Sequence, residues 1–237
     1  MSKSDALDLY AKVEDLLGVK EASPALYSRY TLFLNTIHFD SILDVGCGSG
    51  DFLLQVNSSF EPKEILGIDL SPSMVKRSRE QGVTAQCMNL CDLDGSFDVI
   101  TAVFDMLNYL NDKELEQFLQ CVVSRINRDG YFLCDINTLY GFEEVAVGLY
   151  IVDDGDRFLA IESDFEEGIY RSDFTLFEKS ESLYQKSKET ISQYCHTVEK
   201  IKTYLSGMEL VVRDDVFLYG DDADKSFLVF RKVPLGS

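Results

Sequence analysis

The sequence is short of zinc ligands and of long apolar runs. It has only two histidines among 237 residues, and its six cysteines form no C-x-x-C pair, so a metal site is not expected. No apolar run approaches the ~18 residues that a bilayer-spanning helix requires. The first residues also lack the continuous apolar stretch of a secretory signal. We therefore expect a protein that has no membrane partner and is not exported.

Basic residues are also scarce. The chain has 22 Lys and Arg residues against 41 Asp and Glu residues, which gives a net charge of −19. Because nucleic-acid binding depends on Lys and Arg that neutralise phosphates, a nucleic-acid partner is not expected. The one dense basic stretch, residues 76–79, falls on a predicted helix, where it is typical of a solvated face.

What the chain does contain indicates one enzyme-sized domain with an addition. Its 237 residues and 46% apolar content are enough for one α/β core. The six cysteines are scattered, several within apparent buried strands or helices, and are predicted to be free core thiols in a reducing cytoplasm. They are Cys47, Cys87, Cys91, Cys121, Cys134 and Cys195.

A glycine-rich turn at residues 43–53 is the most informative segment. Residues 41–45 are typical of a buried strand, and Gly46, Gly48 and Gly50 follow at every second position. Glycines here allow a sharp turn and close approach of a ligand, and the next helix directs its unpaired N–H groups at that ligand. The spacing G-x-G-x-G differs from the dinucleotide pattern G-x-G-x-x-G, and no Lys follows as in a P-loop.

With Asp44 two residues ahead of Gly46, this turn resembles the first motif of the class I S-adenosylmethionine-dependent methyltransferases. The next segment, 64–74, supports the resemblance, because it is a strand that ends in an acid and is followed by Ser71-Pro72, a helix start. That acid, Asp69, suits a β-α-β unit in which a carboxylate accepts hydrogen bonds from both ribose hydroxyls.

Further segments resemble the same family in the same order. Residues 86–92 are similar to the third strand tip, where the Asn89 side chain would meet the adenine amino group and the Leu90 N–H its ring nitrogen. The family often has Asp where this chain has Asn89. Residues 96–110 resemble the fourth strand and the loop beside the transferred methyl group, and residues 130–137 resemble the fifth strand.

The resemblance implies S-adenosylmethionine as cofactor and S-adenosylhomocysteine as product. Alternatives from the residues alone stay open: Asp44 as a loop anchor, Asp69 as a neighbour of a helix cap, Met74 as core, and Tyr27, Arg29 and Tyr30 as helix-packing residues. The implied cofactor-binding residues are Asp44, Gly46, Cys47, Gly48, Gly50, Asp69, Leu70, Met74, Asn89, Leu90 and Phe104, with Tyr27 and Arg29 from the N-terminal segment.

The expected fold is α/β, a Rossmann-like and mostly parallel sheet with an antiparallel last strand. Its expected parts are an N-terminal helical cap (1–37), a cofactor-binding domain (38–140 and 196–234) and an antiparallel β insert over the acceptor (141–195). Within the cap we expect helices at 6–17 and 24–37, the second capped by Ser23. Strands are expected near 41–46, 64–69, 84–88, 97–103 and 130–136, with helices at 50–57, 72–81 and 112–127.

The insert allows two interpretations. Its acids and aromatic residues suit a cradle for a cationic amine, or a half-exposed sheet with aromatics inward and acids outward. The segment Glu189-x-x-x-Gln193 resembles the return segment of the glycine and aminosugar N-methyltransferases, although the His and Arg common there are Ile191 and Tyr194 here. The acids are Asp153, Asp154, Asp156, Glu162, Asp164, Glu166 and Glu167.

Methyl transfer from an activated sulfonium needs positioning more than covalent catalysis. Within the loop 104–109, we expect Tyr109 and Asp105 to orient a small-molecule acceptor or to take its proton. The leading hypothesis is N-methylation of a small molecule, with O-methylation as the nearest alternative. An NAD-dependent oxidoreductase, a non-catalytic cofactor-binding module and a homodimeric assembly stay open.

Overall fold

The computed structural model describes residues 9–181 and 183–233. The first predicted helix, 6–17, begins outside the described residues. Residues 9–13 are helical, and a 3-10 turn, η1 (Glu14–Leu16), follows them.

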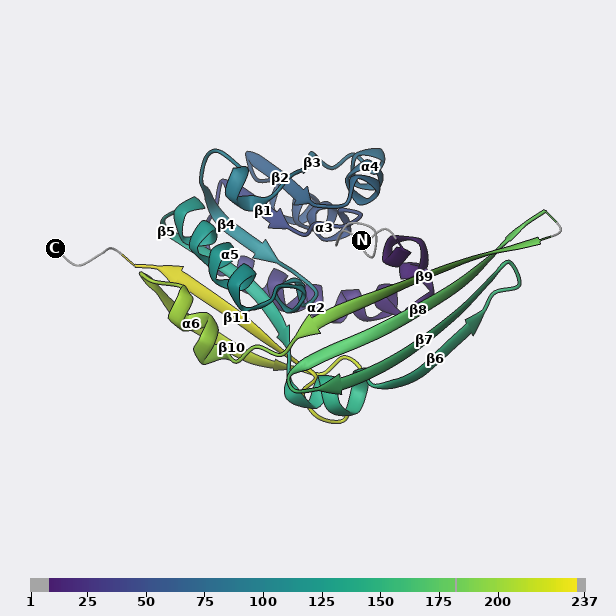
Figure 1. Cartoon of the computed structure of the whole chain (residues 1–237). Helices are drawn as coiled ribbons and strands as arrows, with labels where there is room; N and C mark the ends of the chain where they lie inside the picture. Colours follow the sequence, from purple (N-terminus) through teal and green to yellow (C-terminus); the bar gives the residue numbers. More distant parts are fainter. Residues whose placement is uncertain (1–8, 182, 234–237) are drawn as a thin grey trace.

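A seven-stranded sheet forms the centre of the molecule (Figure 1). Five strands are parallel: β1 (Ser41–Val45), β2 (Glu64–Asp69), β3 (Ala85–Cys87), β4 (Phe97–Ala102) and β5 (Ile126–Asn137). An antiparallel hairpin of β10 (Met208–Val216) and β11 (Lys225–Lys232) completes the order β10-β11-β5-β4-β1-β2-β3. The predicted Rossmann-like fold is confirmed.

Helices cover both faces of this sheet. One core contains apolar residues of α5 (Asp112–Arg125) and α6 (Val198–Tyr204). The other contains residues of α2 (Val19–Leu34), α3 (Asp51–Phe60) and α4 (Pro72–Glu80). Local signals start two of these helices: Ser71 caps α4 ahead of a proline, and Asn111 forms a capping box with Glu114 at α5.

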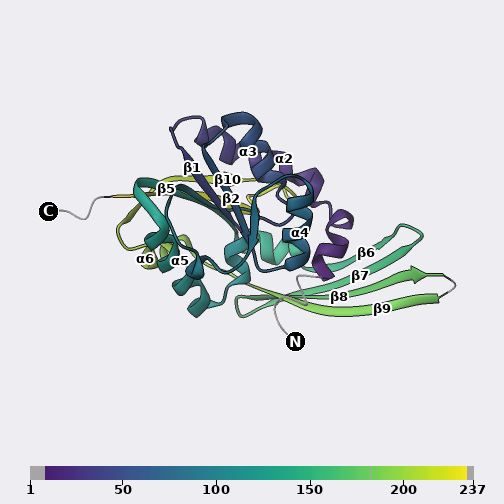
Figure 2. The same cartoon turned by 90° about the horizontal axis from the view of Figure 1, so that it is seen from above.

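The insert is a separate antiparallel sheet that extends sideways as a curved arm (Figures 1 and 2). A π-helical turn, η4 (Gly141–Ala146), leads into β6 (Gly148–Asp153), β7 (Arg157–Glu166), β8 (Ile169–Ser180) and β9 (Leu183–Tyr194), paired in chain order. All seven acids that the cationic cradle required are exposed. The apolar side chains of the inner face are Leu159, Ile161, Phe174, Leu176 and Ile191.

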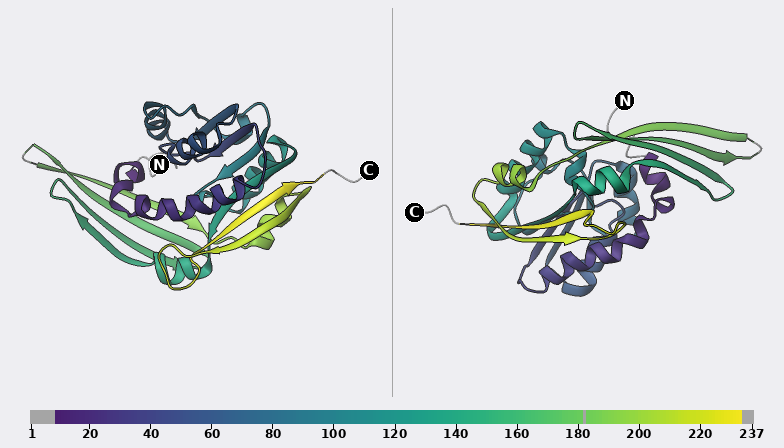
Figure 3. Two further views of the ribbon diagram at one scale, coloured as in Figure 1. Left: turned by 180° about the vertical axis from the view of Figure 1, so that it is seen from behind. Right: turned by 90° about the horizontal axis from the view of Figure 1, so that it is seen from below.

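The N-terminal segment joins the insert to the cofactor-binding half (Figure 3). Leu9 and Val13 pack into the apolar inner face of the insert. The guanidinium of Arg157 donates two hydrogen bonds to the carboxylate of Asp15, at 3.0 and 2.7 Å. From α4, Arg77 donates to the backbone carbonyl of residue 11 at 2.7 Å. This segment is therefore anchored on both sides.

The predicted start of the second helix and its predicted cap are both wrong. The second helix begins at Val19 after Gly18, not at Pro24, and Ser23 is no cap because its hydroxyl donates to the Val19 carbonyl at 2.6 Å. Pro24 therefore lies inside α2.

The cysteines are not all free. Cys91 and Cys121 form a disulfide with a Cα–Cα distance of 5.3 Å, whereas Cys47, Cys87, Cys134 and Cys195 are free thiols. The disulfide connects the turn after β3 to α5, two segments that lie 30 residues apart in sequence.

Within the described residues, no helix combines the length and the apolar character needed to cross a bilayer.

Candidate active site

The glycine turn after β1 requires glycine at specific positions. Gly46, Gly48 and Gly50 have φ values of 76°, 52° and 89°, in the left-handed region that favours glycine. A Cβ at Gly46 would lie 2.8 Å from Met106 Cγ, and one at Gly50 would lie 2.5 Å from the Ser78 hydroxyl. The turn therefore packs closely against the loop after β4 and against α4.

Asp69 lies at the end of β2, beside this turn. Its carboxylate accepts hydrogen bonds from the N–H of Gly48 at 2.9 Å and from the N–H of Ser71 at 2.8 Å, one on each oxygen. Asp69 therefore orders the turn, and its side chain is among those that line the cavity described below.

Asp44 is buried at the end of β1. Burial raises its pKa to about 7, although the Thr101 hydroxyl, which donates to its carboxylate at 2.6 Å, opposes the shift, and nearby Asp69 adds to it. A buried carboxylate that is only partly ionised near neutral pH favours a cationic ligand, because a positive charge stabilises the ionised form.

These residues lie in a cavity of about 260 Å³, which we call the cofactor cavity. The predicted site residues that line it are Tyr27, Asp44, Gly46, Cys47, Gly48, Asp69, Leu70, Met74, Asn89, Leu90, Phe104 and Tyr109. Gly50, Arg29 and Asp105 are not among its lining residues. Gly50 lies behind the cavity wall as the N-terminal cap of α3. Arg29 is half-buried on α2.

The charge of the cofactor cavity suits a cation. Among the described lining residues are the carboxylates of Glu14, Asp44, Asp51 and Asp69, and no Lys, Arg or His. This donor set fits S-adenosylmethionine, which carries a sulfonium, an ammonium and a ribose with two hydroxyls. The four carboxylates do not fit the pyrophosphate of a dinucleotide, because their negative charges repel it and no cationic side chain among the described lining residues offsets them.

Sequence reasoning missed the contribution of the first helical segment. Tyr10 and Glu14 line the cofactor cavity, followed by Val19, Ser23 and Tyr27 from α2. The spacing of four residues between Tyr10 and Glu14, and again among the three residues of α2, places each set on one helix face. That periodicity was the available signal.

Asn89 lies on the adenine side that the resemblance indicates. Its side-chain oxygen accepts a hydrogen bond from the N–H of Cys91 at 2.9 Å and so caps the 3-10 turn η2 (Leu90–Asp92). Because Cys91 is also bonded to Cys121 on α5, the turn that carries Asn89 and Leu90 is covalently fixed to a neighbouring helix.

A second cavity of about 350 Å³, the acceptor cavity, lies between the insert and the N-terminal segment. It shares two lining residues, Tyr10 and Tyr109, with the cofactor cavity. Its remaining lining residues are Leu17, Val145, Ala146, Val147, Gly148, Leu149, Tyr150, Ile161, Ser163, Tyr170, Ser172, Phe174, Ile191 and Gln193. Tyr109 therefore stands in the wall where the two cavities adjoin.

Tyr109 remains a neutral phenol at ordinary pH. Burial, with a further contribution from the negative charge of Asp105, raises its pKa well above the usual value for tyrosine. A hydrogen bond to the side chain of Gln193 opposes this shift. The hydroxyl is therefore suited to orient a substrate by hydrogen bonding, and not to act as an ionised base.

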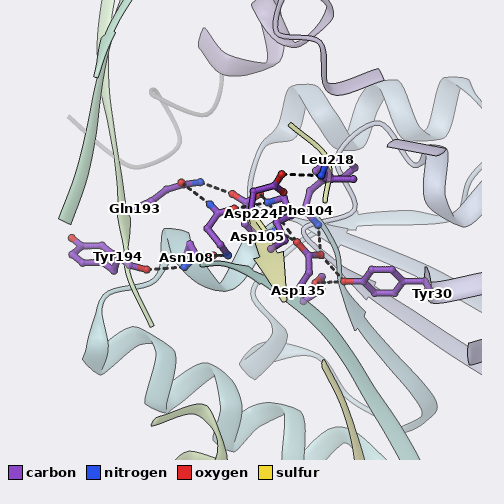
Figure 4. A network of polar contacts seen from close by, with 12 residues as sticks. Tyr30, Phe104, Asp105, Asn108, Asp135, Gln193, Tyr194, Leu218 and Asp224 are labelled. Atoms are coloured by element: carbon purple, nitrogen blue, oxygen red, sulfur yellow. Dashed lines mark hydrogen bonds and ion pairs between the residues drawn. The ribbon is translucent and has the colours of Figure 1, made fainter. Parts of the chain in front are cut away.

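Asp105 belongs to a buried polar network beside the cavities (Figure 4). Its carboxylate pairs with the ammonium of Lys225 and accepts a hydrogen bond from Gln193 at 2.6 Å. Lys225 also donates to Asn137 at 2.6 Å. No local pattern in the sequence indicates Lys225, which lies 120 residues from Asp105.

Asp135, at the end of β5, fixes the loop that leads to Tyr109 (Figure 4). Its carboxylate accepts hydrogen bonds from the N–H groups of Phe104 and Asp105, both at 2.8 Å, and from the Tyr30 hydroxyl at 2.6 Å. Phe104 and Asp105 have φ values of 57° and 48°. Such a backbone conformation is unfavourable outside glycine and persists when its surroundings hold it.

Comparison with known proteins agrees with this geometry. Residues 42–130 match the family model described as a methyltransferase domain. The methyltransferase YqeM of Bacillus subtilis is 24% identical over 69% of this chain and 70% of its own length.

Among solved structures, an S-adenosylmethionine-dependent methyltransferase from Clostridium acetobutylicum has a TM-score of 0.76 at 21% identity, over 96% of this chain and 98% of that chain. The sugar N-methyltransferase KedS8 from Streptoalloteichus has a TM-score of 0.74 at 16% identity, over 99% and 95%. At these identities the likeness shows a shared fold.

The matched domain makes this chain a methyltransferase whose cofactor is S-adenosylmethionine, and its fold is that of the class I enzymes.

Proposed function

We propose that the protein transfers the methyl group of S-adenosylmethionine to the nitrogen of a small-molecule amine bound in the acceptor cavity. The observation that carries this proposal is that two cavities, one lined by carboxylates and one uncharged, share Tyr10 and Tyr109 in their walls. The name of one structural neighbour, a sugar N-methyltransferase, supports nitrogen as the acceptor atom.

The uncharged walls of the acceptor cavity favour nitrogen over oxygen. A hydroxyl group must lose its proton to become a good nucleophile, whereas a neutral amine already presents a lone pair. Among the described residues that line the acceptor cavity there is no His, Asp, Glu or Lys to take such a proton. O-methylation remains the alternative, and it would require a base from outside these residues.

In this proposal the cofactor cavity holds the donor by its charges and hydroxyls. Bound S-adenosylmethionine supplies a methyl group already activated on a sulfonium. Asp69 would accept hydrogen bonds from the ribose hydroxyls, and Asn89 with the Leu90 N–H would bind the adenine. The glycine turn and Asp44 lie along the remaining, positively charged part of the ligand.

The rate of transfer then depends on how the acceptor is positioned relative to the methyl donor. The acceptor lone pair has to lie in line with the reacting bond at about 3 to 3.5 Å, and we assign that orientation to the Tyr109 hydroxyl. Asp105 is a positioning residue here, because its carboxylate is paired with Lys225 and it does not line either cavity. Arg29, which is not a lining residue, takes no role.

The proposal also assigns roles to the parts of the chain. The helical cap (1–37) and the insert (141–195) would enclose the acceptor over the cofactor-binding domain (38–140 and 196–234).

The four free thiols support a cytoplasmic location. In that location the Cys91–Cys121 disulfide would form reversibly. A homodimer stays open.

Incubation with methyl-labelled S-adenosylmethionine and a metabolite extract tests the proposal. Mass spectrometry of the labelled products is expected to find the label on nitrogen. Asp69→Ala should abolish labelling, whereas Asp92→Ala, at an exposed acid of the neighbouring turn, should leave it unchanged. Label on oxygen alone would contradict the proposed acceptor, and no label in any product would favour a non-catalytic module.

A further inference from the structure

The two cavities differ in charge. Four carboxylates line the cofactor cavity, whereas no charged side chain lines the acceptor cavity within the described residues. The acids of the insert do not change this, because Glu162, Asp164 and Asp173 are exposed. Burial of a phosphate or carboxylate without a counter-ion is strongly unfavourable. The acceptor cavity therefore disfavours a charged ligand body.

Most of the acceptor cavity is apolar. The aliphatic and aromatic side chains of Leu17, Val145, Leu149, Ile161, Phe174 and Ile191 form much of its wall. Its volume of about 350 Å³ lies at the small end of the range for small-molecule sites. An uncharged and apolar environment also disfavours an ammonium relative to the free amine, which is the form that carries the nucleophilic lone pair.

Part of the wall of the acceptor cavity is polar, and it contains three hydrogen-bonded hydroxyl groups that we call the hydroxyl chain. Ser163 and Ser172 lie directly opposite each other on β7 and β8, with 3.1 Å between their oxygens. The Tyr170 hydroxyl donates to Ser163 at 2.9 Å and lies 3.2 Å from the carbonyl of Ala146. Because each hydroxyl both donates and accepts, the chain can run in either direction.

Ser172 is the last residue of this hydroxyl chain. It is 3% exposed and lines the acceptor cavity. Within the described residues its hydroxyl has one hydrogen-bond partner, Ser163. One hydrogen-bonding position at the end of a buried chain therefore remains for a ligand. The reversible direction of the chain lets that position serve as donor or acceptor, which suits a hydroxyl group.

Given the proposed function, we infer that the acceptor is an amine whose enclosed body is uncharged, largely apolar, and carries a hydroxyl group that binds at Ser172. The amine lies toward Tyr109, where the two cavities adjoin, and the hydroxyl lies toward the inner face of the insert. Charged groups, where an acceptor has them, stay outside the acceptor cavity.

Three cyclic amines of similar size test this inference: trans-4-aminocyclohexanol, cyclohexylamine and 4-aminocyclohexanecarboxylate. Calorimetry measures their binding to the protein saturated with S-adenosylhomocysteine, and labelled donor measures their methylation. The two amines without a carboxylate are expected to bind, the aminocyclohexanol most tightly and the aminocyclohexanecarboxylate at least 10-fold more weakly than the aminocyclohexanol. Stronger binding of the aminocyclohexanecarboxylate, or no binding of either amine that lacks a carboxylate, would overturn the inference.

Variants test the role of the hydroxyl chain. Ser172→Ala should weaken the binding of aminocyclohexanol about 10-fold, as expected for one lost hydrogen bond. The same variant should weaken the binding of cyclohexylamine less than about 2-fold. Ser180→Ala, at an exposed position of the same strand, is the matched control and should change neither. Equal weakening of both amines by Ser172→Ala would contradict hydroxyl recognition. Retained binding of S-adenosylhomocysteine verifies folding, and Tyr170→Phe replaces Ser172→Ala if that variant fails to bind it.

Failure of the inference is distinguishable from failure of the proposed function. Methylation of the amine that carries a carboxylate in preference to the two that lack one would overturn the uncharged acceptor body and leave N-methylation standing. Methylation of hydroxyl oxygens alone, detected by mass spectrometry of the same products, would overturn both.

Discussion

The ammonium of Lys225 and the carboxylate of Asp105 form an ion pair inside the protein, with side chains that are 4% and 14% exposed. A second carboxylate, that of Asp135, lies 3.7 Å from the same ammonium. Burial opposes the charge of Lys225, but Asp105 and Asp135 prevail and raise its pKa above the usual value for lysine. One cation on β11 therefore stabilises both acids that fix the loop before Tyr109.

Loss of this cation should destabilise the fold. Lys225→Met leaves Asp105 and Asp135 buried without a counter-ion, and removal of one partner of a buried pair costs about 3 to 5 kcal/mol. Urea denaturation should show a decrease of that size in the free energy of unfolding. Lys202→Met, which removes an exposed pair with Glu199, should cost less than about 1 kcal/mol. Equal effects of the two variants would contradict the account of the network.

Cofactor affinity should rise with pH through the titration of Asp44. Its pKa is about 7 in the folded protein because of burial, whereas a cationic ligand favours the carboxylate. Affinity for S-adenosylhomocysteine, whose ammonium is charged, should therefore increase from pH 5.5 to about 7 and level off above it, by up to about tenfold per pH unit. Calorimetric titrations at several pH values measure this. Asp44→Asn should bind more weakly and without the rise, and a flat profile of the wild type would contradict the assignment.

The same titration affects the stability of the ligand-free protein in the opposite direction. Asp44 binds its proton more tightly in the folded state than in the unfolded chain, where its pKa is about 3.9. Its contribution to the free energy of unfolding is therefore full below pH 4 and is lost as the pH rises to about 7. Urea denaturation of wild type and Asp44→Asn from pH 4.5 to 8 isolates it, because the difference between the two proteins should change across that range. A constant difference would contradict the shifted pKa.

Removal of the disulfide should destabilise the protein and weaken cofactor binding. Cys121→Ser opens a bridge between segments 30 residues apart, and a bridge of this kind contributes about 2 to 4 kcal/mol. The turn with Asn89 and Leu90 also loses its attachment to α5, so affinity for S-adenosylhomocysteine should decrease. Cys87→Ser, at an exposed free thiol, is the control. Identical stability and affinity of the two variants would show that the bridge does not hold this turn.

Tyr109 should affect methyl transfer more than cofactor binding. Tyr109→Phe preserves the aromatic wall and removes the hydroxyl that we assign to orientation of the acceptor, so kcat should fall by about 10- to 100-fold, as expected when a reacting group is less well positioned. The Kd of S-adenosylhomocysteine should stay within about 2-fold, because the ring itself remains. Tyr184→Phe, at an exposed tyrosine of β9, should change neither quantity. A Tyr109→Phe enzyme with unchanged kcat would exclude the hydroxyl from the reaction.

Local patterns were sufficient to predict the parallel sheet and most of the cofactor cavity. The distance between Gly50 and Asp69 is the length of one helix and one strand, so a β-α-β unit brings both to the same edge of the sheet. The capping signal at Ser71 acts within four residues and was likewise readable.

Long-range and competing local effects account for what the sequence did not predict. Lys225 meets Asp105 only because β11 pairs with β5, and no local pattern reports that register. The Cys91–Cys121 bridge depends on how α5 packs beside η2. At α2, the proline suggested a first helical position, but Gly18 adopts a left-handed conformation and caps a helix that begins at Val19, five residues before Pro24. The Ser23 hydroxyl bonds within the helix instead.

The most direct test of the account is a crystal structure with S-adenosylhomocysteine and trans-4-aminocyclohexanol bound together. We expect the ribose hydroxyls on Asp69, the sulfur directed toward Tyr109, and the acceptor nitrogen on the opposite side of the same residue in the acceptor cavity. A nucleoside bound away from Asp69, or an acceptor that reaches the sulfur by a route not lined by Tyr10 and Tyr109, would contradict the transfer of a methyl group between these two cavities.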